Sequence, residues 1–225
     1  MSAGVFITFE GPEGSGKSTH LRRLAERLRA EGRTVLTTRE PGGTPVGEAV
    51  RGLLQHDSGG ETPEPRAEVL LFCASRAQLV NRVISPALAR GEWVLCDRFA
   101  DSTLAYQGFG RGFDLEALVA INGFATGGVV PALTLLLDLD VAAGMRRLAA
   151  RHAALATEAD RFEREHCAFH ARLRDGFLAL AADAPERFCV IDSDREPDVV
   201  AEAIWQAVRA RFGANRKERL VRHAD

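Results

Sequence analysis

The 225-residue sequence lacks three features that would each assign it to a different class of protein. Its net charge is only −2, which gives no indication of a surface for nucleic acid. No apolar run approaches the roughly 20 residues that cross a bilayer, and no signal peptide is visible. Its four cysteines form no C-x-x-C pair, so neither a zinc site nor a disulfide framework is predicted. We therefore expect reduced thiols in a cytoplasmic protein, with no nucleic-acid or membrane partner.

Lysine is also scarce, since only Lys17 and Lys217 occur among the 29 lysines and arginines. Lys17 stands in a run that matches G-x-x-x-x-G-K-[ST], the pattern of a phosphate-binding loop. The run consists of Gly11, Pro12, Glu13, Gly14, Ser15, Gly16, Lys17 and Ser18. A compact ammonium fits within a cradle of backbone amides where a planar guanidinium does not. Lysine at this one position is therefore informative.

The flanks of this loop are those that the pattern requires. An apolar run at 4–10 predicts a strand before it, and leucines at helical spacing over 16–31 predict a helix after it. A strand, a glycine-rich turn and a helix N-terminus together direct backbone N–H groups at a polyphosphate. We predict that the loop, Lys17 and Thr19 bind ATP and that the Ser18 hydroxyl holds Mg²⁺.

Predicted strands and helices alternate along the chain, without an internal repeat. The predicted strands are 4–10, 34–38, 93–97, 132–138 and 188–192. The predicted helices are 16–31, 45–55, 64–90, 114–125, 141–153, 158–183 and 196–211. Strands separated by helices indicate an α/β fold, with a five-stranded parallel sheet flanked by helices on both faces. A polar, basic tail is predicted at 213–225.

A triphosphate site alone fits an ATPase, a GTPase, a kinase or a ligase. The chain has no Asn-Lys-x-Asp segment for reading guanine, which disfavours a GTPase. Asp97 ends the predicted strand 93–97, at the sheet edge where ligands bind in open α/β folds. We predict that Asp97 holds Mg²⁺ together with Ser18. Asp138, which ends another strand, is the competing acid, and we expect it to cap its strand instead.

Two arginines favour phosphoryl transfer onto a second phosphate. Arg39 lies in a turn-rich run, and Arg98 directly follows Asp97. A phosphate acceptor is already anionic, so the reaction needs no general base, but cations must offset the repulsion between two polyanions. Arginine provides both the charge and a two-pronged geometry. The alternative is that both arginines form structural salt bridges.

Three segments in this order resemble the signatures of bacterial thymidylate kinases. They are the phosphate loop, then Thr38-Arg39-Glu40-Pro41-Gly42-Gly43-Thr44, then Asp97-Arg98-Phe99 with Ser102-Thr103 and Ala105-Tyr106-Gln107-Gly108. The resemblance extends from about residue 5 to 212. It implies a P-loop NTPase domain at 1–212 with a helical lid at about 146–164, and a homodimer. It also implies Mg²⁺-dependent transfer of the ATP γ-phosphoryl group to dTMP, giving ADP and dTDP.

The resemblance further implies roles for individual residues. Glu13 corresponds to an acid that meets the sugar 3′-hydroxyl or the metal zone of the monophosphate. Arg39 and Arg98 correspond to the arginines that hold the acceptor phosphate. Phe72 corresponds to a ring that stacks on the base, and Arg76 to a guanidinium that bonds thymine O4.

The remaining assignments concern the third signature and the lid. Thr103 and Gln107 correspond to base or ribose contacts, and Tyr106 to a ring that crowds the sugar 2′ position and favours deoxyribose. Arg151 corresponds to the lid guanidinium that neutralises the transferring group. The expected catalytic set is Lys17, Arg39, Asp97, Arg98 and Arg151. The alternatives are a kinase for another nucleoside monophosphate and a non-catalytic ATP-binding regulatory protein.

Overall fold

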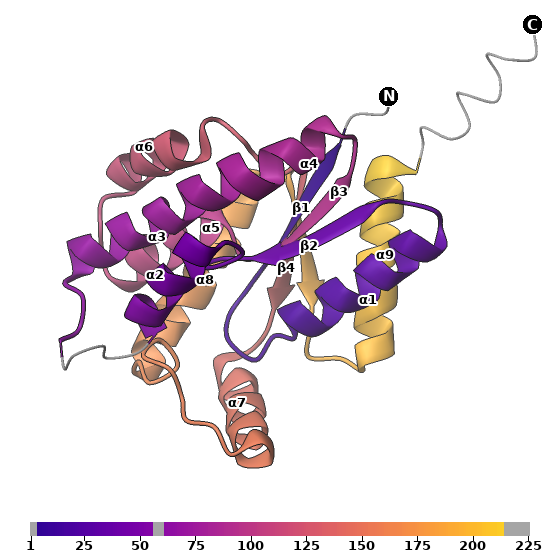
Figure 1. Ribbon diagram of the computed structural model, residues 1–225. Coiled ribbons are helices and arrows are strands. Elements are labelled where there is room, and N and C mark those ends of the chain that lie inside the picture. Colours follow the sequence, from indigo (N-terminus) through magenta and orange to yellow (C-terminus); the bar gives the residue numbers. More distant parts are fainter. Residues whose placement is uncertain (1–3, 56–60, 214–225) are drawn as a thin grey trace, which may run out of the picture.

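Five parallel strands form one sheet in the order β2-β3-β1-β4-β5 in the computed structural model, which describes residues 4–55 and 61–213 (Figure 1). The strands are β1 Val5–Glu10, β2 Val35–Arg39, β3 Trp93–Asp97, β4 Leu133–Asp138 and β5 Phe188–Asp192. β1 is central, because Ile7 pairs with Leu95 of β3 on one side and with Leu133 of β4 on the other. The predicted parallel sheet is confirmed, and each strand lies within one residue of its predicted bounds.

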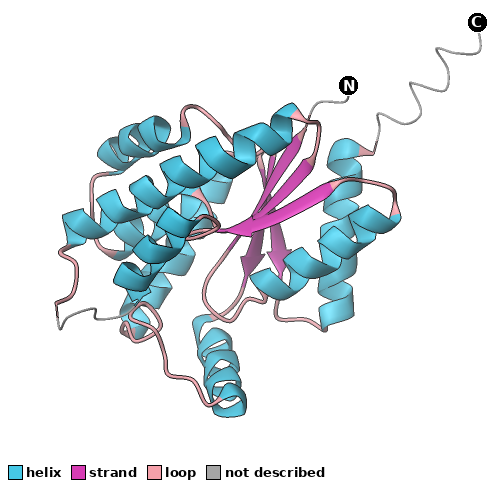
Figure 2. Ribbon diagram, in the orientation of Figure 1, coloured by secondary structure: helices cyan, strands magenta, loops and turns pink. Residues whose placement is uncertain are grey.

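Helices cover both faces of this sheet (Figure 2). They are α1 Lys17–Ala30, α2 Pro45–Gln55, α3 Pro65–Leu79, α4 Ser85–Ala89, α5 Ala100–Thr103, α6 Leu115–Thr126, α7 Val141–Leu155, α8 Cys167–Asp183 and α9 Pro197–Phe212, with π-helical turns η2 Val80–Ile84 and η3 Leu104–Gly110. Ile7 and Phe9 point to the face covered by α1 and α9, whereas Phe6 points to the face covered by η2 and α4. Burial of both faces explains why the strands read as continuous apolar runs.

Two helical predictions were wrong. The helix predicted from 158 begins only at Cys167, because the Asp160 carboxylate accepts hydrogen bonds from the backbone N–H of Phe162 (2.9 Å) and Glu163 (3.0 Å). Such side-chain bonds stabilise a turn in place of a helix. The segment 100–110, for which no helix was predicted, forms α5 and η3.

The phosphate-binding loop between β1 and α1 fits closely against the β4–α7 region. Gly11 has a φ of 138°, and a Cβ atom there would lie 2.3 Å from the carbonyl oxygen of Leu137. Gly14 has a φ of 75°, and its Cβ would lie 2.6 Å from the carbonyl oxygen of Gly144 in α7. Glycine is therefore required at both positions for steric and conformational reasons.

We expect Gly14→Ala to destabilise the fold by about 2 kcal/mol or more, because alanine is strained at this φ and its Cβ meets α7 backbone. Thermal unfolding should show a melting temperature lower by about 4 °C or more. Gly52→Ala is the matched control, since no atom lies within 4 Å of a Cβ built in that helical position. Equal melting temperatures for the two variants would contradict this account of the loop.

Candidate active site

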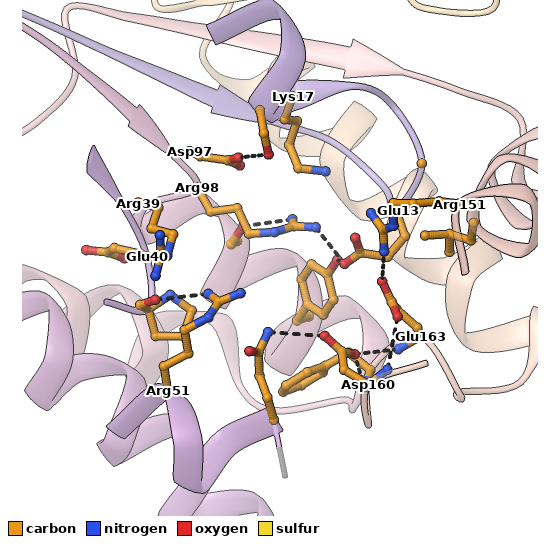
Figure 3. Close-up of a pocket in the computed structure, with 18 of the residues that line it drawn as sticks. Glu13, Lys17, Arg39, Glu40, Arg51, Asp97, Arg98, Arg151, Asp160 and Glu163 are labelled. Atoms are coloured by element: carbon orange, nitrogen blue, oxygen red, sulfur yellow. Dashed lines mark hydrogen bonds and ion pairs between the residues drawn. The ribbon is translucent and has the colours of Figure 1, made fainter. Parts of the chain in front are cut away.

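A cavity of about 660 Å³ lies at the carboxyl edge of the sheet, where β1, β2 and β3 end (Figure 3). Most of the predicted site residues line it, namely Glu13, Gly14, Gly16, Lys17, Ser18, Thr19, Arg39, Phe72, Asp97, Arg98, Thr103, Tyr106, Gln107 and Arg151. Predicted residues outside its wall are Gly11, Pro12, Ser15 and Arg76. Ligands bind at this edge in open α/β sheets. The cavity is therefore the candidate active site.

The Lys17 ammonium is held by its own loop. Its Nζ donates to the carbonyl oxygens of Gly11 (3.1 Å) and Pro12 (2.8 Å) and to Ser15 Oγ (3.3 Å). Burial and the nearby Arg98 guanidinium lower the pKa of Lys17 to about 8. Gly16, in the left-handed region with a φ of 84°, directs the chain into α1 so that Lys17 is its first residue. The ammonium is thus positioned for a polyphosphate in the loop.

The Ser18 hydroxyl and Asp97 meet at the foot of this loop, where Ser18 Oγ donates to Asp97 Oδ2. Asp138, the competing acid, does not bond to Ser18. Its two oxygens accept from Arg174 at 2.7 and 2.9 Å. Hydroxyl and carboxylate oxygens suit Mg²⁺, which binds few protein ligands and completes its shell with phosphates and water. No group of three His, Cys, Asp or Glu residues with metal-binding geometry occurs within 4–55 and 61–213. A Mg²⁺ ion held by Ser18 and Asp97 would therefore depend on the nucleotide's own oxygens.

Arg98 joins the end of β3 to the phosphate-binding loop (Figure 3). Its backbone has a φ of 69°, a strained value for arginine, and is fixed by a 2.9 Å bond from its N–H to the Phe9 carbonyl. Its guanidinium donates to the Gly11 carbonyl at 3.1 Å and to Glu13 Oε1 at 2.6 Å. The Tyr106 hydroxyl donates to the same Glu13 oxygen at 2.6 Å. Strain at such a position indicates that the side chain's direction matters to the site.

Neighbouring charges determine whether the Glu13 carboxyl is ionised. Burial alone would raise the pKa of this carboxyl, but Arg98, Lys17 and the hydrogen bond from Tyr106 lower it to about 2. Glu13 is therefore an anion at every pH near neutrality.

Sequence reasoning missed Glu10, which supports Arg98 from below. Its buried carboxylate accepts from the Phe99 N–H (2.7 Å) and from Ser102 Oγ (2.6 Å), and Ser102 Oγ in turn accepts from Arg98 at 3.3 Å. Burial and the charge of Asp101 raise the pKa of Glu10 to about 8. The sequence did contain a signal for Glu10, since it is an acidic residue at the end of the apolar run, directly before the phosphate-binding loop.

Arg39 and Arg51 line the opposite side of the cavity (Figure 3). Arg39 donates to both oxygens of Glu48, at 3.0 and 2.8 Å, and stays half exposed. Arg51, which sequence reasoning missed, donates to the Pro41 carbonyl at 3.0 Å. Two guanidinium groups thus face the cavity from the region of β2 and α2.

Arg76 lies behind the cavity wall, and its side chain is only 1% exposed. Its donors reach Glu40 Oε2 (2.9 Å), Thr103 Oγ1 (3.0 Å), Asn122 Oδ1 (2.6 Å) and the Phe99 carbonyl (3.1 Å). In this arrangement Arg76 braces the wall, and its contact with thymine O4 stays a prediction. Glu40 and Asn122 are buried partners that sequence reasoning did not identify as site residues.

Aromatic side chains close the cavity on the side where Phe72 lies. Phe162, from the segment after α7, has its ring centroid 5.8 Å from that of Phe72 and 5.9 Å from that of Tyr106. Three rings that share one corner of a cavity offer apolar surface for a planar base. Sequence reasoning found Phe72 and Tyr106 but missed Phe162.

Arg151 lies in α7, within the predicted lid (Figure 3). Arg151 donates to Glu163 Oε1 at 2.5 Å, and His152 Nε2 lies 3.0 Å from Glu163 Oε2. Asp160 Oδ2 accepts from Gln55 Nε2 of α2 at 3.1 Å. The segment after α7 is therefore tied to the opposite wall, through residues that periodicity assigned to a helix.

A family model described as thymidylate kinase matches residues 9–204 of the chain. The chain belongs to the thymidylate kinase family. A thymidylate kinase of Deinococcus radiodurans is 54% identical over 211 residues, which cover 94% of this chain and 99% of the relative. One of Solidesulfovibrio magneticus is 53% identical over 206 residues, covering 91% and 98%. The crystal structure of thymidylate kinase from Ehrlichia chaffeensis aligns with a TM-score of 0.71 and 33% identity, covering 92% and 99%.

Membership of the thymidylate kinase family confirms the resemblance and the P-loop fold. Among the described helices, none has the length and apolar character needed to cross a membrane.

We expect Glu13→Gln to reduce the free energy of unfolding by up to about 3 kcal/mol at neutral pH. The folded-state pKa of Glu13 lies below its unfolded value, so its contribution is present above 4.5 and is lost as the pH falls through about 2. Urea unfolding from neutral to acidic pH should therefore show the difference between wild type and variant shrinking below pH 4.5. Glu26→Gln, at an exposed position of α1, is the control and should show no such trend. A difference that stays constant over this range would contradict the assignment.

Proposed function

We propose that this thymidylate kinase family member transfers the γ-phosphoryl group of ATP to dTMP, giving ADP and dTDP. The observation that carries the proposal is the approach of Arg98 to the phosphate-binding loop, because it brings a cation for the acceptor phosphate beside the donor site. Family membership supports dTMP as the acceptor. A non-catalytic regulatory role and a kinase for another monophosphate are both less favoured.

In the proposed mechanism the loop amides, Lys17 and Thr19 bind ATP. Ser18 and Asp97 would hold Mg²⁺, which when bound neutralises charge on the β- and γ-phosphates. Arg39 and Arg98 hold the acceptor phosphate in line with the donor. Catalysis of phosphoryl transfer consists mainly of such positioning and of charge stabilisation. The charge and position of each side chain at the cavity support these roles.

Arg151 neutralises charge on the transferring group. Arg151 exchanges its carboxylate partner, Glu163, for phosphate oxygens as the lid at about 146–164 settles over the nucleotides. Closure excludes water, which would otherwise accept the phosphoryl group. Glu13 remains the anionic partner of Arg98 and meets the sugar 3′-hydroxyl or the metal zone of the monophosphate.

The nucleoside of dTMP lies between α3 and η3. Phe72 stacks on the base, and Arg76 bonds thymine O4. Tyr106 crowds the 2′ position, and Thr103 and Gln107 contact the base or the ribose. The thymidylate kinase-like domain spans 1–212; of the basic tail at 213–225, all but Gly213 lies outside the described residues.

We further propose that the chain forms a homodimer in the cytoplasm. The paired helices α3 and α6 expose apolar side chains, including Leu70, Val119 and Phe124, which is 91% exposed. Contiguous exposed apolar surface commonly marks a protein interface. The four free cysteines fit a reducing compartment.

A coupled ADP-release assay tests the function, with ATP, Mg²⁺ and dTMP, dUMP, UMP, dCMP, AMP or GMP as acceptor. We expect turnover with dTMP well above that with the others, and loss of turnover on chelation of Mg²⁺ that returns when the metal is added back. Strong turnover with another monophosphate would keep the mechanism but reject the base-recognition residues. ATP binding without transfer to any acceptor would refute the kinase proposal.

A further inference from the structure

Glu68 is a fully buried carboxylate that the proposed mechanism does not use. It lies in the first turn of α3 and binds side chains from two other parts of the chain. Its Oε1 accepts from Gln107 Nε2 at 2.7 Å and from Arg111 Nε at 2.8 Å. Its Oε2 accepts from Arg111 Nη2 at 3.1 Å and forms an ion pair with Arg161 at 2.6 Å. Two guanidinium groups thus offset the cost of burying the charge.

The bond from Gln107 fixes which way its amide group points. A side-chain amide has an amino group that donates and an oxygen that accepts, and the two ends are nearly equal in size. A carboxylate only accepts, so the amino end of Gln107 must face Glu68. Gln107 lines the cavity and Glu68 does not. The end of the amide left for a bound ligand is therefore the oxygen.

We propose that Glu68 is a positioning residue for base specificity, which holds Gln107 with its oxygen directed at the nucleobase. This inference rests on the proposed function, because it concerns the base of the acceptor monophosphate. Gln107 follows Tyr106 directly, and Tyr106 and Phe72 form the aromatic corner of the same cavity with Phe162. Its amide is thus placed to meet the polar edge of a base that stacks there.

The chemistry of the pyrimidines makes this orientation selective. Thymine and uracil carry a hydrogen on N3, so they offer a donor to the Gln107 oxygen. Cytosine N3 carries a lone pair instead of a hydrogen. With cytosine bound, two acceptors, N3 and the Gln107 oxygen, would face each other without a hydrogen between them. An unrestrained glutamine would turn its amide and bind either base. Glu68 removes that freedom, and an unpaired buried acceptor then disfavours cytosine.

The test compares kcat/KM for dTMP and dCMP, with dUMP as the pyrimidine that keeps the N3 hydrogen but lacks the methyl group. In Glu68→Gln the new amide can donate as well as accept, so the Gln107 amide is free to turn. We expect the preference for dTMP over dCMP to fall by about tenfold or more. The preference for dUMP over dCMP should fall in parallel.

A double variant and a matched control separate specificity from structure. Glu68→Gln combined with Gln107→Glu returns an acceptor-only group to position 107, and should restore the preference for dTMP over dCMP. Arg161→Gln removes an ion pair of Glu68 but leaves its bond to Gln107, so it should alter the rates with both nucleotides and keep their ratio within about twofold. A ratio unchanged in folded Glu68→Gln, or not restored by the double variant, would refute the proposal.

The wild-type protein provides a second test that does not depend on a variant's folding. Acidification protonates cytosine N3 and gives it a hydrogen to donate. Titration calorimetry should therefore show dCMP affinity rising relative to dTMP affinity as the pH is lowered, since phosphate protonation affects both ligands alike. A constant ratio would contradict a fixed acceptor. If the wild type does not phosphorylate dTMP, the proposed function is wrong. If it does, but the dTMP-to-dCMP ratios change neither in Glu68→Gln nor with pH, only the proposed role of Glu68 is wrong.

Discussion

The ion pair between Arg98 and Glu13 is the interaction on which the site depends. At 2.6 Å it links the end of β3 to the phosphate-binding loop, beside the hydrogen bonds from Arg98 to the Gly11 carbonyl and from Ser18 to Asp97. Its geometry requires the left-handed backbone of Arg98, which the Phe9 carbonyl and the Glu10–Ser102 pair hold in place. Residues of the central strand β1, Phe9 and Glu10, therefore help to fix the position of Arg98 at the edge of the cavity.

The cations of the cavity already have acceptors within the protein. Arg39 is paired with Glu48, Arg151 with Glu163, and the Lys17 ammonium with loop carbonyls. Arg39 and Arg151 are about half exposed, so their ion pairs contribute little to stability and can be broken at low cost. In the proposed mechanism, phosphate binding exchanges one anionic partner of these cations for another. The cavity wall therefore carries carboxylates beside its cations before a nucleotide binds.

The sequence predicted the features that depend on residues close together along the chain. The loop, the five strands and Asp97 each follow from a few consecutive residues, because backbone conformation and strand ends depend on near neighbours. Sequence reasoning could not find Glu68 or Glu10, because their roles arise from partners 39 or more positions away. The helix start at 158 was wrong for a related reason: the Asp160 carboxylate competes with helical bonding, and periodicity does not register that competition. Arg76 matched its motif, yet burial turned its donors toward protein groups.

The most direct test of the account is the kinetics of Arg98→Ala, measured together with its affinity for ATP. In the proposed mechanism Arg98 holds the acceptor phosphate, so its loss should lower kcat with dTMP by about 10² to 10³. ATP affinity should remain close to that of the wild type, because the loop amides and Lys17 are unchanged, and it also reports that the variant is folded. Turnover equal to the wild type in a variant that binds ATP normally would remove Arg98 from the mechanism.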